Sequence, residues 1–188
     1  TLEDQQESFA DLSLLLLIVS LLVYIVLASQ FESLTYPFMI ILTVPFAFTG
    51  SILLLAITGE PLGIMGFVGM IMLVGMVVKN AIVLIDYINL NRERGMSIIT
   101  AVTHGGRSRL RPVLMTTLTT ILGMVPLAIG TGQGSEMWQT LGIAIIGGMT
   151  FSTIITLILI PALYSSMAGY GVRRRRRKHR EVLVGNGN

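Results

Sequence analysis

Five long apolar runs dominate the chain, and each has close to the roughly 20 residues that a helix needs to cross a bilayer. Inside lipid only helices and closed barrels pair every backbone polar group, so runs of this length predict helical spans. The five spans are expected at about Leu12–Ala28, Phe38–Ile57, Ile64–Ile88, Pro112–Ile129 and Leu141–Met167. Gly, Pro, Ser and charged residues separate the runs, as is typical of loops. The sequence therefore predicts an all-α membrane protein.

The composition supports this fold class and excludes several kinds of site. Hydrophobic residues make up 53% of the chain and charged residues 12%, which is too apolar for a water-exposed surface. There is no cysteine, and the two histidines are His104 and His179. We therefore expect no disulfide, no metal site and no cofactor. The spans contain no His, Cys or paired carboxylates, so an enzyme would lack its nucleophile and base, and no enzymatic activity is expected.

The distribution of charge predicts the orientation in the membrane. Of the 13 Lys and Arg, all but Lys79 lie in the segment Asn89–Arg111 or in the tail Arg173–Arg180, whereas the N-terminal flank is acidic. The positive-inside rule then places both basic segments in the cytoplasm and the N-terminus outside, in the periplasm. We expect residues 1–11 to end a periplasmic region, 12–167 to form the transmembrane domain and 168–188 to be a basic cytoplasmic tail.

The tail follows a membrane span and has no interleaved aromatic residues, so it fits an anchor to anionic lipid better than a nucleic-acid site. No nucleic-acid partner is expected.

Lys79 is the only ionisable residue between Pro61 and Ile85. A rise of 1.5 Å per residue puts it about 22 Å beyond Ile64, within the hydrocarbon layer. A lysine there costs at least about 2.5 kcal/mol and normally belongs to an ion or substrate pathway. Asp86 is about 10 Å further along the helix, too far to pair with it. We expect the acidic partner to lie outside this chain; the alternative is a lysine that snorkels to the cytoplasmic boundary.

Two further groups complete the candidate site. Asn80 follows Lys79 directly, and the segment MTTLTT places hydroxyls on one face of the fourth span. Thr116 is expected to meet the Lys79 face of the neighbouring span. The alternative is that threonines bond back to carbonyls of their own helix, which we expect for Thr117 and Thr119.

Small residues predict where helices approach each other closely. Glycines at 63, 66, 69 and 75 in the third span, and Gly142, Gly147 and Gly148 in the fifth, are interpreted as a packing seam. Ser97–His104 is expected to be a short interfacial helix that stops at Gly105–Gly106.

Four stretches together resemble the resistance-nodulation-division superfamily, specifically its hydrophobe and amphiphile efflux pumps. They read LASQFESLTYPFMIILTVPFAFTG, VGMVVKNAIVLIDYIN, RLRPVLMTTLTTILGMVPLAIGTGQGSE and IGGMTFSTIITLILIPALY. The likeness extends from about Phe9 to Tyr164. It implies that the chain is a fragment of a longer protein and forms the last five helices of a twelve-helix transporter in the inner membrane.

The resemblance also implies a proton relay. In this family an aspartate pair on an earlier helix works with a lysine and a threonine from later helices; Lys79 and Thr116 match these positions, and Arg109 matches an arginine near the cytoplasmic mouth. Protonation of a carboxylate would release Lys79 toward Asn80 and Thr116, and the helices would tilt.

The implied activity is drug/proton antiport, with protons and hydrophobic or amphiphilic compounds as substrates. The metal-exporting branch usually carries an acidic residue near the position of Lys79, so the Lys79–Asn80 pair favours the drug branch. The family further implies a homotrimer with a periplasmic adaptor and an outer-membrane channel. The alternative function is a membrane scaffold or assembly protein that conducts nothing, in which Lys79 could be replaced by methionine without loss.

Overall fold

The computed structural model describes residues 2–185, and side chains as far as residue 169. Six helices account for almost all of this part: α1 Leu2–Phe31, α2 Thr35–Ile41, α3 Thr43–Thr58, α4 Ile64–Glu93, α5 Ile98–Ala128 and α6 Ser135–Gly185. Five helical segments are long and apolar enough to cross a membrane, when α2 and α3 are taken together as one span. The predicted all-α fold with five spans is confirmed.

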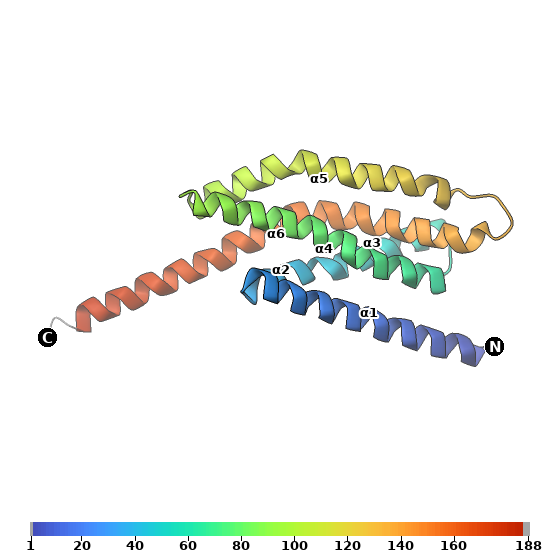
Figure 1. Ribbon diagram of the computed structural model, residues 1–188, viewed down its shortest axis with the longest axis horizontal. Coiled ribbons are helices and arrows are strands. Elements are labelled where there is room, and N and C mark those ends of the chain that lie inside the picture. The colour runs from blue at the N-terminus through green and yellow to red at the C-terminus, as the bar shows by residue number, and fades with distance from the viewer. Residues whose placement is uncertain (1, 186–188) are drawn as a thin grey trace.

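Helix α6 is the centre of the bundle. It packs against α3, α4 and α5, while α1 lies at the edge of the bundle beside α4 (Figure 1). The last part of α6 leaves the bundle and points away from the other helices (Figure 1). Helix α1 touches the start of α4 through Phe9 and Phe67, whose ring centroids are 5.5 Å apart.

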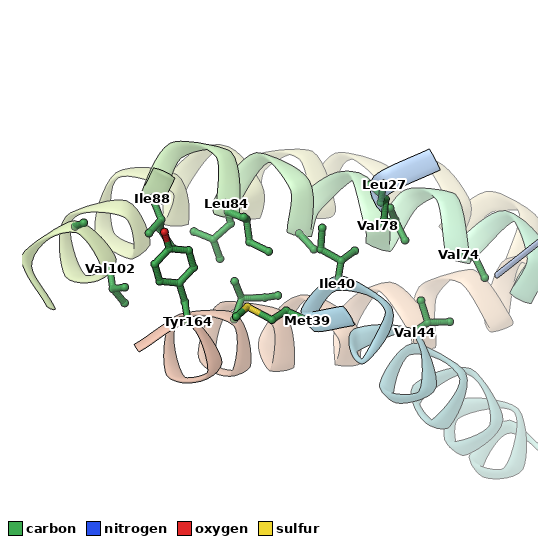
Figure 2. Close-up of a cluster of buried hydrophobic side chains, with 14 residues drawn as sticks. Leu27, Met39, Ile40, Val44, Val74, Val78, Leu84, Ile88, Val102 and Tyr164 are labelled. Carbon is green, nitrogen blue, oxygen red and sulfur yellow. The ribbon is translucent and has the colours of Figure 1, made fainter. Parts of the chain in front are cut away.

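The largest buried cluster lies between α2, α4 and α6. Met39 and Ile40 of α2, Ile88 of α4 and Tyr164 of α6 are all at most 1% exposed. Figure 2 shows Tyr164 reaching from α6 toward α4 near Ile88, with Met39 beside it. This core fixes the end of α4 relative to α2 and α6.

The glycines of α6 form the predicted packing seam. A Cβ atom added at Gly147 would lie 2.6 Å from the backbone oxygen of Gly50, so α3 and α6 are in backbone contact there. The hydroxyl of Ser51 donates to the carbonyl of Ala144 across the same interface, at 2.7 Å. Gly63 and Gly75 have open space around them and do not belong to the seam.

The helix boundaries differ from the sequence prediction: α5 begins at Ile98 instead of Pro112, and α6 extends beyond Leu141–Met167 at both ends. The second span is split at Leu42 into α2 and α3, because Pro45 has no N–H to donate to the carbonyl four residues earlier. The first helix begins at Leu2, well before Leu12.

The prediction of a short helix ending at Gly105–Gly106 is wrong. Helix α5 continues from Ile98 to Ala128 without interruption. Gly105 instead packs closely on Ile88 of α4, and this helix contact outweighs the helix-breaking tendency of glycine, which amounts to about 1 kcal/mol. Ser97 caps the helix as its N-cap residue.

Candidate functional site

Lys79 lies on an exposed face of α4, between the buried residues Val78 and Asn80. Met72 and Gly75, which precede Lys79 by seven and four residues, and Asp86, which follows it by seven, are exposed as well, so they share this open face. No hydrogen bond or ion pair joins Lys79 to any of the residues with described side chains. Its ammonium group is therefore free to meet a partner from outside these five spans.

Thr116 lies at nearly the same depth on α5. The short α4–α5 connection makes the two helices antiparallel, and Gly105 touches Ile88. Lys79 is about 14 Å from Ile88 along α4, and Thr116 about 17 Å from Gly105 along α5, by the 1.5 Å rise. Both residues are exposed. Their depths agree to within about 3 Å, and a contact between them stays a prediction.

The threonines of MTTLTT bond in two different ways. The hydroxyl of Thr116 donates to the carbonyl of Pro112 at 3.0 Å, and that of Thr119 to Met115 at 2.8 Å. The expected back-bonding is thus confirmed for Thr119 but wrong for Thr117. Thr117 is buried, and its hydroxyl pairs with that of Thr153 on α6 at 3.1 Å. The hydroxyl pair between helices is stabilised by burial, where no water competes.

Unlike Lys79, which is exposed and without a partner among the described side chains, Asn80 is buried and Arg109 stacks on an aromatic ring. Asn80 is only 9% exposed and is rotated about 100° from Lys79 around α4. Arg109 lies about 10 Å before Thr116 along α5, and its guanidinium group stacks on the ring of Tyr87, 4.5 Å from the centroid. Its buried Nε has no hydrogen-bond partner among the described side chains. The structure does not bring Arg109 to Lys79.

Two features were missed by sequence reasoning. Thr153 is one of several hydroxyl residues in α6, and nothing in its spacing marks it as the partner of Thr117. Arg92 and Tyr164 lie far apart in sequence, yet the Arg92 Nη1 donates to the Tyr164 hydroxyl at 3.4 Å. An arginine in the last turn of a membrane helix was the one available signal, because such residues seek polar or aromatic partners.

Comparison with known proteins gives the family. Residues 1–168 match the model of the AcrB/AcrD/AcrF family. The chain belongs to that family. This match confirms the resemblance to the resistance-nodulation-division superfamily, whose efflux transporters include the AcrB/AcrD/AcrF proteins.

Relatives of this AcrB/AcrD/AcrF chain carry names of different kinds. It is 39% identical to the swarming motility protein SwrC of Bacillus subtilis over 89% of this chain and 16% of the relative. It is 41% identical to the cobalt-zinc-cadmium resistance protein CzcA of Cupriavidus metallidurans, over 87% of this chain and 15% of that protein. The multidrug resistance protein MdtC of Erwinia tasmaniensis is 40% identical over 77% of this chain and 14% of its own length.

A crystal structure of a heavy metal efflux pump has the same arrangement of helices. Its TM-score is 0.80 at 35% identity, over 89% of this chain and 16% of that chain. The chain thus spans about one sixth of the length of these proteins. Because relatives named for multidrug resistance and for metal resistance are similarly related to this chain, family membership leaves the substrate class open.

Proposed function

We propose that this chain forms part of the transmembrane domain of a proton-driven efflux transporter in the inner membrane, which exports hydrophobic or amphiphilic compounds. The observation that carries the proposal is the exposed Lys79 part-way along α4, without a partner among the described residues. A charged ammonium group in hydrocarbon is strongly unfavourable unless it is paired. We infer that carboxylates on another part of the full-length protein cover the open face of α4.

The mechanism follows from the electrostatics of that pair. The ammonium group of Lys79 stabilises the charged form of a neighbouring carboxylate and so keeps its proton affinity low. When the lysine moves away, the proton affinity of the carboxylate rises. When the carboxylate takes up a proton, Lys79 loses its attraction and turns to neutral acceptors. The Thr116 hydroxyl oxygen, at the same depth, can accept such a hydrogen bond while it donates to Pro112. Proton uptake thereby changes the packing between α4 and α5.

The roles proposed for Asn80 and Arg109 are secondary. Asn80 is next to Lys79 and contributes an amide oxygen on the inner side of the helix. Arg109, held by Tyr87, adds positive charge on the cytoplasmic side of the relay. The homotrimer, the periplasmic adaptor and the outer-membrane channel belong to the same proposal for the full-length protein.

Metal-ion export is the second candidate function. The relative CzcA is named for cobalt, zinc and cadmium resistance, and the similar crystal structure is of a heavy metal efflux pump. Against it, Lys79 is followed directly by Asn80 rather than by an acidic residue. A cation at this position would repel metal ions that pass close to it.

The test uses the full-length gene in a bacterial strain that lacks its own efflux pumps. Lys79→Met should reduce export of amphiphilic dyes and drugs to the level of cells without the gene, while the amount of protein in the membrane stays normal. The control is Met72→Leu on the same face of α4, which should keep wild-type export. Normal drug export by Lys79→Met would refute the relay. Tolerance to cobalt, zinc or cadmium, without any drug export by the wild type, would replace the drug substrate by metal ions.

A further inference from the structure

A pocket of about 180 Å³ lies between α2, the connection that precedes it, α6 and the end of α4. It has room for several water-sized groups and therefore for a phosphate group. Its polar lining consists of Ser33, Thr35, Tyr36, Arg92 and Tyr164. No carboxylate is among the described lining residues, so the charge at this pocket is positive.

Tyr164 holds the guanidinium group of Arg92 in place. Its hydroxyl accepts a hydrogen bond from Nη1 of Arg92 at 3.4 Å and donates one to Oδ1 of Asn89 at 2.5 Å. The guanidinium carbon lies 5.9 Å from the centre of the same ring. The same ring also stacks on Tyr36, with centroids 5.7 Å apart and planes 15° from parallel. The arginine is thus oriented by a side chain that is itself buried and fixed.

Most of the hydrogen-bonding capacity of Arg92 stays unused. A guanidinium group has five N–H donors, and within the described part of the chain Arg92 uses them only for the hydrogen bond to Tyr164 and a weaker one to Tyr36, without an ion pair. Arginine donors in this fork geometry suit the oxygens of a phosphate. The hydroxyls of Ser33 and Thr35 in the pocket wall can donate to the same group.

The pocket is separate from the proposed relay. Arg92 is thirteen positions after Lys79, which at 100° per residue places it about 220° further around α4. The pocket therefore opens on a different side of α4 from the face where the partner of Lys79 is expected.

The position along the membrane normal fits a lipid headgroup. Arg92 is in the last turn of α4, at the end that the positive-inside rule assigns to the cytoplasm. Tyr164 is on α6, whose sequence continues into the basic tail Arg173–Arg180. Each basic residue near the surface attracts anionic lipid by about 1 kcal/mol, which raises the local concentration of phosphate headgroups.

We propose that this pocket binds the phosphate headgroup of an anionic membrane lipid, with Arg92 as the main contact and Tyr164 as the residue that positions it. The site is independent of proton coupling, so it stands or fails separately from the proposed function.

The experiment measures binding of phosphatidylglycerol to the purified full-length protein by native mass spectrometry, with phosphatidylcholine as the neutral comparison. We expect Arg92→Gln to weaken phosphatidylglycerol binding about tenfold, because a charge-assisted hydrogen bond is lost. Arg94→Gln removes the same charge from an exposed residue that does not line the pocket, and it should bind as the wild type does.

Several results would overturn the site. One is that Arg92→Gln binds phosphatidylglycerol as tightly as the wild type does. Another is that Arg94→Gln weakens this binding as much as Arg92→Gln does, since that would indicate nonspecific attraction. If glycerol phosphate competes as well as the intact lipid at equal concentration, the site takes soluble phosphate and the lipid assignment is wrong. Tyr164→Phe keeps the stacked ring and serves if Arg92→Gln does not fold; we expect about threefold weaker binding, and unchanged binding would exclude the positioning role.

Discussion

At the scale of single residues, the hydroxyl groups of α5 divide into two sets according to where they lie. Thr116, Thr119 and Thr120 are on the outer side of the helix and donate to carbonyls of their own helix. Thr117 is buried, and its hydroxyl is 3.1 Å from that of Thr153 on α6. This pair fixes the rotation of α5 about its axis, and with it the direction in which Thr116 points.

The first residue-scale prediction concerns this pair. Thr117→Val and Thr153→Val should each destabilise the full-length protein, and the double variant should show a coupling energy of about 0.6 kcal/mol, as is typical of hydrogen bonds between membrane helices. The free energies of unfolding of the three variants and the wild type are measured by titration with a denaturing detergent. Thr119→Val, which disturbs only a bond within α5, is the control and should show no coupling with Thr153→Val. Strict additivity of Thr117→Val and Thr153→Val would mean that the hydroxyls do not interact.

A second prediction concerns Arg109 and Tyr87. Tyr87→Leu removes the aromatic face below the guanidinium group and should destabilise the protein by about 0.5 to 2 kcal/mol. Tyr87→Phe keeps the ring face and should retain most of the stability. The measurement is the midpoint of thermal unfolding in detergent. If both variants lose the same amount, the stability comes from the tyrosine hydroxyl and not from the stacking.

At the scale of elements, close contact between α3 and α6 organises the bundle. Gly50 and Gly147 allow the two backbones to touch, and the bond from Ser51 to Ala144 adds a polar contact between the same helices. In lipid, where apolar side chains gain little by leaving the solvent, such close packing is a main source of helix association. The face of α3 that meets α6 therefore tolerates little added volume.

The element-scale prediction follows from that contact. Gly147→Ala places a methyl group 2.6 Å from the Gly50 oxygen, so the helices must separate, and we expect destabilisation of about 1 to 3 kcal/mol. Gly123→Ala on α5 is the matched control, since a Cβ there has nothing within 4 Å and alanine favours the helix. Folded yield and detergent-denaturation midpoints measure both. Wild-type stability of Gly147→Ala would contradict the assignment of the seam.

The sequence predicted well those elements whose structure depends only on the surrounding lipid. Long apolar runs must become helices in lipid, so the five spans followed directly from their length. The stop expected at Gly105–Gly106 rested on local glycine chemistry, and the contact of Gly105 with Ile88 overrode it. The same limit applies to the site: the depth of Lys79 is a property of one helix, whereas the pairing of Thr117 with Thr153 depends on how two helices are rotated.

At the scale of the whole molecule, the arrangement in the membrane is the feature that most needs an experiment. The α4–α5 connection contains Arg94 and Gly95, and the α5–α6 connection contains Gln133, at the opposite end of the bundle (Figure 1). The basic residues predict that the α4–α5 end is cytoplasmic.

The absence of cysteine from the chain makes this orientation easy to measure. Single variants Arg94→Cys and Gln133→Cys, in a full-length protein without other cysteines, should react differently with a membrane-impermeant maleimide. Gln133→Cys should be labelled in cells whose outer membrane alone is permeable, and Arg94→Cys only after the inner membrane is opened. Labelling in the reverse order would overturn the predicted orientation.

The depth of Lys79 has a further consequence, for the way in which the membrane potential acts. One elementary charge that crosses the whole membrane gains about 2.3 kcal/mol per 100 mV. If Lys79 shifts toward Thr116 by the roughly 3 Å that separates their depths, it crosses about a tenth of a hydrocarbon layer of about 30 Å. Its energy then changes by only about 0.2 kcal/mol per 100 mV. In the proposed relay the lysine movement is therefore almost insensitive to voltage, and the electrical driving force must act on the proton during its entry and exit.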